Sequence, residues 1–260
     1  MNLRSRIIGR APLAGLIVKM PAHSVVELAG HTGFDFVLLD TEHGSADTGE
    51  LEQHLRAADA AGIPVLVRVA ATDPAAILRA LDAGAAGIVV PHVSTAEAAE
   101  AAVRAAHYPP RGVRGLAVST RAGRYGSTSL ADHLAKASRE TVVVVQAEDV
   151  EAARNCGAIA ATAGVDAVWI GPTDLSLSLG VPGQLRHPTY LETVRHITAA
   201  VAAAPECALC ALVGDAEAAA EWRAQGASVL LFNHSTLLAD SLRNAVRIRE
   251  NGAGRIPHDE

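Results

Sequence analysis

Eight short apolar runs recur along this chain, and segments with helical periodicity separate each run from the next. These segments begin with helix-starting residues such as Asp73 and Pro74, and several end at a glycine such as Gly62 or Gly84. Alternating strands and helices predict an α/β fold, the (β/α)8 TIM barrel, with its active site on the loops that follow the strands. A doubly wound open sheet is the alternative architecture. The runs cover residues 14–19, 35–40, 64–69, 87–92, 141–147, 166–171, 208–213 and 228–232.

The chain length of 260 residues suits one such barrel, because these barrels commonly occupy ~250 residues. Residues 1–260 are therefore expected to form a single barrel domain. Half of the residues are apolar and only 3% are aromatic, so Ala, Val, Leu and Ile must build the core. That composition is typical of parallel strands that are buried on both faces.

The net charge and the apolar segments limit which partners the protein can bind and where it can be located. The formal net charge of -6, without a basic stripe, argues against a nucleic-acid partner. The longest apolar stretch, residues 199–213, is interrupted by Pro205 and Glu206 and is too short to cross a membrane. The N-terminus lacks the apolar segment of a secretion signal, so a cytoplasmic protein is expected.

The chain has three cysteines, which fit a reducing compartment. Cys207 and Cys210 form a C-x-x-C pattern, but they enter a strand-like run in which residues three apart point to opposite faces. We therefore interpret them as buried structural thiols rather than as a redox or zinc pair.

One connection is much longer than the usual few residues between a strand and a helix. Residues 107–140 separate the fourth run from the fifth. We expect this insertion to cover the mouth of the barrel or to pack against a neighbouring subunit. Its arginines are candidates for meeting an anionic substrate, and a solvated or subunit-contact role is the alternative; they are Arg111, Arg114, Arg121 and Arg124.

Two carboxylates directly follow neighbouring strands, Glu148 after the fifth run and Asp174 after the sixth. Because neighbouring strands end at the same rim, these oxygen ligands can reach one divalent cation. The alternative is a pair of solvated loop acids. The turn at residues 171–176 adds free backbone N–H groups near a helix start. A 2-oxo acid could place its carboxylate there while the metal acts as a Lewis acid on its keto group.

Arg68 and His43 end two other apolar runs. A permanent charge within an apolar run is costly unless it is paired, so Arg68 either forms a structural salt bridge with Asp40 or Glu42 or stabilises a developing oxyanion. His43 can take up a proton near neutral pH, and beside a metal it is a candidate base. We interpret His92, at the end of the fourth run, as part of the pocket wall.

Several motifs of this chain occur in a characteristic order: VLLDTEHG, VLVRV, LDAGAAGIVVPHV, YPPRGVRG, RAGRYG, VVVVQAED and VWIGPTDLSLSLG. Together they resemble the HpcH/HpaI aldolase family of metal-dependent class II pyruvate aldolases. The resemblance is strongest to the branch that acts on 4-hydroxy-2-oxoheptanedioate and on 2-keto-3-deoxy sugar acids. It covers residues 5–250 and implies a barrel of the phosphoenolpyruvate/pyruvate type. It also implies a homohexamer with C-terminal segments exchanged between subunits.

The resemblance also implies roles for individual residues. His43 would be the proton acceptor and Arg68 the transition-state stabiliser. Asp82 would raise the basicity of the histidine, although its position near a helix end is opposite the rim in a regular barrel. Either a neighbouring subunit supplies it, or this role does not transfer to the chain. The implied ligands of Mg²⁺, Mn²⁺ or Co²⁺ are Glu148 and Asp174, and the implied pyruvate-binding residues are Gln146, Thr173 and Asp174.

The sequence thus predicts a carbon–carbon lyase that reversibly cleaves a 4-hydroxy-2-oxo acid to pyruvate and an aldehyde. The two lysines, Lys19 and Lys136, lie outside the expected metal constellation, so the mechanism needs no Schiff base. One rival is a CoA-ester lyase of the citrate lyase β-subunit or malyl-CoA type, which should carry a further CoA-binding region. Another is a noncatalytic barrel that binds an oxo acid, which the combined set of acid, base and cation disfavours.

Overall fold

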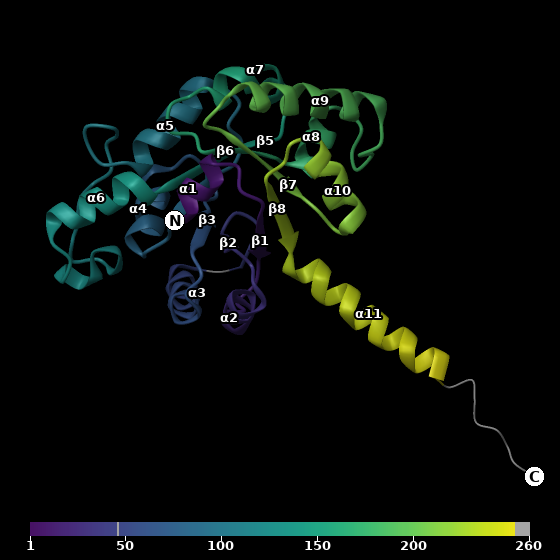
Figure 1. Cartoon of the computed structure of the whole chain (residues 1–260), viewed down its shortest axis with the longest axis horizontal. Helices are drawn as coiled ribbons and strands as arrows, with labels where there is room; N and C mark the ends of the chain where they lie inside the picture. The colour runs from purple at the N-terminus through teal and green to yellow at the C-terminus, as the bar shows by residue number, and fades with distance from the viewer. Residues whose placement is uncertain (46, 253–260) are drawn as a thin grey trace, which may run out of the picture.

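The computed structural model describes residues 1–45 and 47–252, and its strands form a closed barrel (Figure 1). All neighbouring strands pair in parallel, in sequence order, and β1 closes the barrel against β8. The predicted (β/α)8 barrel is confirmed. The expected domain of residues 1–260 also includes residues 46 and 253–260, which lie outside the described residues. The strands are β1 Leu13–Val18, β2 Phe36–Asp40, β3 Val65–Arg68, β4 Gly87–Val90, β5 Val142–Ala147, β6 Ala167–Ile170, β7 Ala208–Leu212 and β8 Val229–Asn233.

Alternation along each strand separates an inner core from an outer one. In β1, Leu13 and Ile17 join the side chains that fill the barrel, whereas Leu16 and Val18 pack outward against the helices. Phe36 of β2 fills the space beside Gly15, where an added Cβ would lie 2.3 Å from the phenyl ring. The barrel is therefore a packed core, and a ligand can be held only at its ends.

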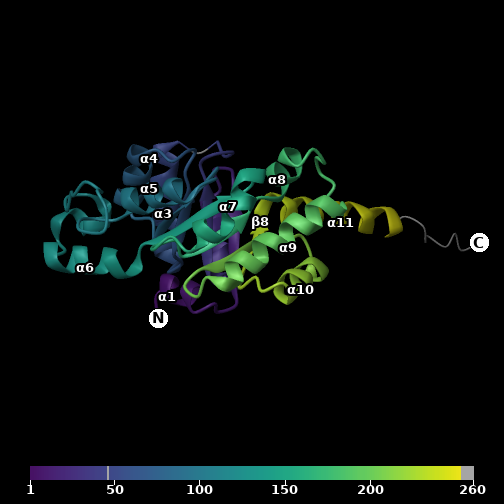
Figure 2. The same cartoon turned by 90° about the horizontal axis from the view of Figure 1, so that it is seen from above.

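Helices surround the strands, and short polar side chains start several of them (Figure 2). Asp47, Asp73, Thr95 and Asp149 each accept a hydrogen bond from an amide of the first helical turn. These caps fix where each helix begins, just beyond the C-terminal end of the preceding strand. The helices are α1 Leu3–Ile8, α2 His23–Thr32, α3 Thr48–Ala61, α4 Pro74–Asp82, α5 Ala96–Ala106, η1 Arg121–Gly126, α6 Leu130–Glu140, α7 Val150–Ala160, α8 Pro172–Ser178, α9 Pro188–Ala203, α10 Ala216–Ala224 and α11 His234–Gly252.

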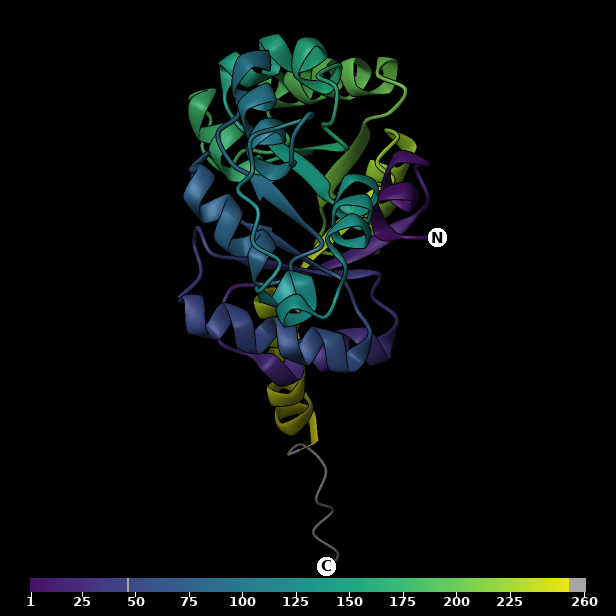
Figure 3. The ribbon, with the colours of Figure 1, turned by 90° about the vertical axis from the view of Figure 1, so that its left-hand side faces the viewer.

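The insertion at residues 107–140 lies at the end of the barrel where the strands begin (Figure 3). η1 contacts α4, and α6 contacts α1 before the chain enters β5. Arg121 donates to the Ala83 carbonyl at 2.9 Å and to Asp59 at 2.6 Å, close to the C-terminal ends of α4 and α3. The expectation that the insertion covers the mouth is therefore wrong for its own barrel. The reason is topological, since the insertion must deliver the chain to the start of β5.

The N-terminal helix α1 closes the same end of the barrel. Leu3 and Ile7 pack into the inner core. Arg4 donates to Asp166 at 2.9 Å, and Arg6 donates to Asp35 at 2.6 Å. With one end closed by α1 and the insertion, the rim formed by the C-terminal ends of the strands is the end that can present reactive groups.

Helix α11 extends away from the barrel in two perpendicular views (Figures 1 and 2). Leu238, Leu242 and Val246 are spaced four residues apart and expose 50%, 59% and 49% of their surfaces. Residues at this spacing share one face of a helix, so α11 presents an apolar stripe to solvent. Among the described helices, none has the length and apolar content required to cross a membrane.

The three cysteines are buried free thiols. Cys210 belongs to the inner core and Cys207 to the outer one, so their side chains lie on opposite faces of the barrel wall. Burial raises the pKa of Cys207 to about 12, which keeps the thiol protonated and unreactive. The interpretation of Cys207 and Cys210 as structural thiols is confirmed.

Candidate active site

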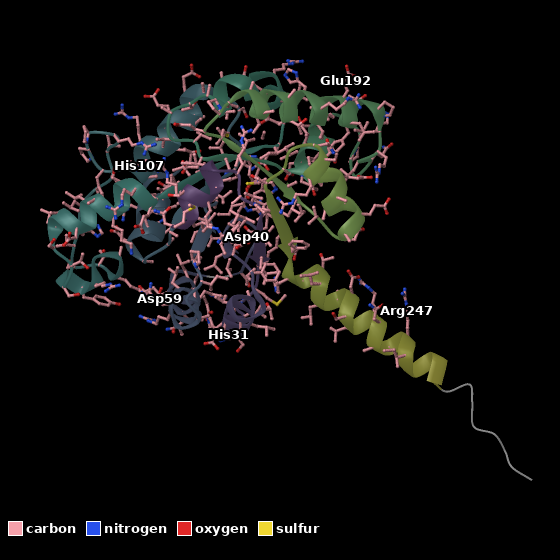
Figure 4. The ribbon with its side chains drawn as sticks, viewed as in Figure 1. His31, Asp40, Asp59, His107, Glu192 and Arg247 are labelled. Carbon is pink, nitrogen blue, oxygen red and sulfur yellow. The ribbon has the colours of Figure 1, made fainter. Side chains whose placement is uncertain are left out.

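The inward-facing residues at the rim are polar, whereas those deeper in the barrel are apolar. Arg68, the last residue of β3, donates from Nε to Asp40 Oδ1 at 2.9 Å and from Nη2 to Asp40 Oδ2. Its Nη1 donates to Gln146 Oε1 at 3.1 Å, and the guanidinium lies 5.2 Å from the Trp169 ring. Figure 4 shows Asp40 in the middle of the barrel, whereas Asp59 and His107 lie near the periphery. The two hydrogen bonds from Arg68 to Asp40 fix the plane of the guanidinium group at the rim.

The charge of Asp40 is set by its partners. Burial alone would raise its pKa, but the hydrogen bonds and charge of Arg68, the His43 amide and the charge of Lys19 together lower it below 3.8. Glu42 Oε2 also lies 3.1 Å from Arg68 Nη1. The salt bridge that the sequence allowed as an alternative role for Arg68 is present, and it involves both Asp40 and Glu42. This pairing is compatible with a role in catalysis, because the bond to Asp40 leaves Nη1 directed toward Gln146 and Glu42.

A second set of contacts joins Glu148 to the same network. Glu148 Oε2 accepts a hydrogen bond from Gln146 Nε2 at 2.7 Å, and Oε1 accepts one from the His92 amide at 2.6 Å. The His92 ring lies between two carboxylates, with Nδ1 3.0 Å from Glu148 and Nε2 3.2 Å from Glu42. His92 has a positive φ of 55°, which is uncommon for a residue with a side chain. This backbone conformation lets both its amide and its ring face Glu148.

Burial and neighbouring charges set the pKa of Glu148. Burial raises its pKa, the amide and ring of His92 lower it, and the nearby charges of Glu42 and Asp174 raise it further, so the pKa lies above 4.5. Gly171 leaves the space for this carboxylate, since an added Cβ would lie 2.6 Å from Glu148 Oε2. Three converging carboxylates supply hard oxygen ligands, and the donor set fits Mg²⁺, Mn²⁺ or Co²⁺.

The remaining predicted site residues divide between the two ends of the barrel. His43 lies in the loop after β2 with an exposed side chain, and its Nε2 is 3.7 Å from Glu42 Oε2. Thr173 and Asp174 lie in the first turn of α8, directly after β6. Asp82 ends α4 at the other end of the barrel, where Arg114 donates to it at 2.7 Å. The structure therefore brings His43, Thr173 and Asp174 to the rim but does not bring Asp82 there within one chain.

The structure also groups His23, Glu50 and His54, whose ligand atoms lie within 4.8 Å of one another. His54 is buried, its Nδ1 bonds to the Glu50 carbonyl at 2.7 Å, and its Nε2 accepts from the Ala22 amide at 3.1 Å. His23 Nε2 lies 2.9 Å from Glu50 Oε2. Because the lone pair of His54 Nε2 already has a partner, a metal would have to displace the Ala22 amide. The carboxylates of the rim are the better candidate ligands.

Comparison with known proteins places this geometry in a family. The family model described as HpcH/HpaI aldolase/citrate lyase matches residues 13–236. The chain belongs to the HpcH/HpaI family. A 5-keto-4-deoxy-D-glucarate aldolase of Escherichia coli O157:H7 is 36% identical over 224 residues, which cover 84% of this chain and 87% of the relative. The resemblance seen in the sequence motifs is confirmed. The relatives are named as aldolases, which are carbon–carbon lyases, so the predicted class of enzyme is confirmed as well.

Two solved structures are similar to this chain over almost its whole length. A family protein from Burkholderia cenocepacia J2315 is 34% identical, with a TM-score of 0.90 over 95% of this chain and 98% of the other. The citrate synthase SbnG is 31% identical, with a TM-score of 0.87 over 98% of this chain and 99% of the other. These similarities confirm the barrel fold and leave the substrate to be inferred from the site.

Sequence reasoning missed three residues of this HpcH/HpaI site. The sequence suggests only a salt-bridge role for Glu42 and a pocket-wall role for His92, although together they connect Arg68 to Glu148. The sequence gives Lys19 no place among the metal-site residues, yet its Nζ lies 3.7 Å from Asp40 Oδ2. The signal available for all three was their position at or just after the end of a strand.

Proposed function

We propose that this HpcH/HpaI protein is a divalent-metal-dependent class II aldolase that reversibly cleaves a 4-hydroxy-2-oxo acid to pyruvate and an aldehyde. The observation that carries the proposal is the buried carboxylate of Glu148, which lies beside Glu42 and Asp174 and is joined through Gln146 to Arg68. A bound cation would offset the mutual repulsion of these carboxylates. Candidate substrates are 4-hydroxy-2-oxoheptanedioate and 2-keto-3-deoxy sugar acids. The 5-keto-4-deoxy-D-glucarate aldolase relative supports the sugar-acid class.

The residues of the rim supply the remaining chemistry. When bound by Glu148 and Asp174, the cation would act as a Lewis acid toward the keto group of the 2-oxo acid. Arg68, held rigid by Asp40, stabilises the oxyanion that develops when the C3–C4 bond breaks. His43 accepts the proton of the C4 hydroxyl. Gln146, Thr173 and Asp174 hold the pyruvate portion.

Asp82 can assist His43 only across a subunit boundary, because it lies at the other end of its own barrel. We therefore include a homohexamer with exchanged C-terminal segments in the proposal. The exposed stripe of Leu238, Leu242 and Val246 supports such an exchange. Replacing Leu242 and Val246 together by Glu should reduce the molar mass measured by light scattering, whereas Asn244→Glu on the same helix should not.

The site and the fold are consistent with one barrel domain that acts on small molecules. A cytoplasmic location is part of the same proposal, and the three buried free cysteines support it.

Exchange of the pyruvate methyl protons in deuterated water tests the proposed chemistry. We expect exchange when Mg²⁺, Mn²⁺ or Co²⁺ is added and none after chelation. Aldol addition with a panel of aldehydes should show the same dependence. Exchange at full rate in exhaustively metal-free protein would refute the metal-dependent mechanism. Binding of pyruvate without exchange would favour a noncatalytic barrel, and turnover of a malyl or citryl thioester alone would favour the CoA-ester lyase.

A further inference from the structure

Lys19 enters the mouth of the barrel from the β1 side. Leu13 and Ile17 point into the barrel, and Lys19 has the same parity two residues beyond Ile17. Its side chain is 34% exposed, and Nζ lies 3.7 Å from Asp40 Oδ2. The ammonium group therefore borders the network that joins Asp40 to Arg68 and Glu148.

Lys19 keeps its hydrogen-bonding capacity for a ligand. The 3.7 Å contact with Asp40 is an ion pair, but it is longer than a hydrogen bond. Both oxygens of Asp40 already accept bonds from Arg68. Among the described residues, Lys19 Nζ makes no hydrogen bond, although an ammonium group has three donors. Asp40 thus holds the cation at the mouth without using its donors.

The other cations are less suited to receive a substrate at this position. Arg68 bonds to Asp40 and Gln146 and lies beside Glu42. Arg114 and Arg121, which the sequence suggested for an anionic substrate, are paired at the other end of the barrel. His234, the first residue of α11 directly after β8, is buried and bonded to the Ile17 carbonyl at 3.0 Å.

Lys19 follows a strand on the opposite side of the barrel from the strand that Glu148 follows. In the closed strand order, β1 lies four strands from β5, so it faces the strand that Glu148 follows. A 2-oxo acid held near Glu148 and Asp174 would direct its aldehyde portion across the mouth toward β1. We propose that Lys19 binds the distal carboxylate of the aldehyde portion, which makes the physiological substrate a dicarboxylic 4-hydroxy-2-oxo acid. This inference rests on the proposed function.

Matched aldehydes test the proposal on the metal-loaded enzyme. Tartronate semialdehyde and succinic semialdehyde carry a carboxylate, and glyceraldehyde and butanal are their uncharged counterparts of equal carbon number. In Lys19→Met, kcat/KM for the carboxylated aldehydes should fall about 10- to 100-fold, the effect of losing a charge-assisted hydrogen bond. The loss for the uncharged aldehydes should be at least about tenfold smaller. Lys19→Arg should retain most of the preference. Lys136→Met is the control, because Lys136 lines a cavity at the opposite end of the barrel.

A loss that is equal for both kinds of aldehyde would overturn the proposal and make Lys19 a structural partner of Asp40. Binding measurements separate this result from a failure of the proposed function. With Mn²⁺ present, calorimetry should show that the wild type binds 2-oxoadipate more tightly than 2-oxohexanoate and that Lys19→Met loses the difference. If the wild type exchanges no pyruvate protons but keeps this difference, the aldolase proposal fails and the carboxylate subsite stands. If wild type and Lys19→Met discriminate equally, the subsite fails whatever the activity.

Discussion

Replacing Gly171 by Ala tests the candidate metal site through a single contact. An added Cβ would lie 2.6 Å from Glu148 Oε2 and 2.8 Å from Glu148 Cβ. The second distance is about 0.7 Å shorter than the ~3.5 Å at which two carbon atoms pack favourably, so Glu148 or the strands must move. The φ of Gly171 is -81°, which any residue adopts, so backbone strain does not contribute. Overpacking of this size should lower the free energy of unfolding by about 1–3 kcal/mol.

The same displacement should weaken metal binding. Glu148 would leave its positions opposite the His92 amide and Gln146 Nε2, which now orient both of its oxygens. Loss of such supporting contacts lowers metal affinity by about 10- to 100-fold. Calorimetric titration of the metal-free variant with Mn²⁺ measures the affinity, and urea unfolding measures the stability.

Gly157→Ala provides the matched control. Gly157 lies within α7, and an added Cβ there would meet no atom within 4 Å. This variant should keep the Mn²⁺ affinity of the wild type and gain up to ~1 kcal/mol in stability from the better helix former. If Gly171→Ala binds Mn²⁺ as tightly as the control does, the metal does not bind at Glu148.

Four further variants test other parts of the protein. Glu148→Gln should make the metal-free protein more stable at pH 7. Burial raises the pKa of Glu148 above 4.5 in the folded protein. The protonated Glu148 therefore contributes its full stabilisation below pH 4.5, and this contribution is lost as the pH rises through the pKa of the folded state. Thermal melts at pH 4 and pH 7 measure the difference, and a variant less stable than the wild type at pH 7 contradicts this account. Arg68→Ala should cost about 3–5 kcal/mol, because it leaves Asp40 buried without its main partner, and should slow proton exchange of pyruvate. Exchange of pyruvate protons at the wild-type rate in folded Arg68→Ala would refute the oxyanion role. His43→Ala should lose more of the aldol cleavage activity than of the proton exchange. Arg121→Ala should lower the melting temperature, because it removes bonds to the C-terminal end of α4 and to the Leu55 carbonyl within α3. The relative rates among aldehydes should not change. A changed preference would place Arg121 at the active site of another subunit.

The sequence predicts the barrel well because buried parallel strands are nearly continuous apolar runs. The run at residues 64–69 contains β3, Val65–Arg68, and the run at 141–147 contains β5, Val142–Ala147. The position of the insertion at residues 107–140 does not follow from periodicity. It follows from connectivity, since any segment that enters β5 must approach from the end where the strands begin.

The sequence predicts those rim residues whose positions depend only on the alternation of side chains along a strand. Glu148 and Gln146 share the inward parity of β5, and Arg68 shares that of β3, so their convergence follows from the alternation of side chains. The bridge through His92 depends on a positive φ outside any strand, which neither hydrophobic pattern nor residue type indicates. The distance from Lys19 to Asp40 likewise depends on how far a flexible side chain reaches.

The position of Asp82 bears on the proposed assembly of subunits. Asp82 bonds to Arg114, whose guanidinium lies 4.6 Å from the Tyr108 ring, and these contacts fix the carboxylate where its own His43 cannot reach it. Among the described side chains, Glu42 lies 3.7 Å from His43 Nε2, and it also contacts Arg68 and His92. A group shared among three partners is a poor candidate for tuning one of them alone. A neighbouring copy that brings its Asp82 to this rim would provide a separate acid for His43. The exposed stripe of α11 supplies an apolar surface that such a copy could bury.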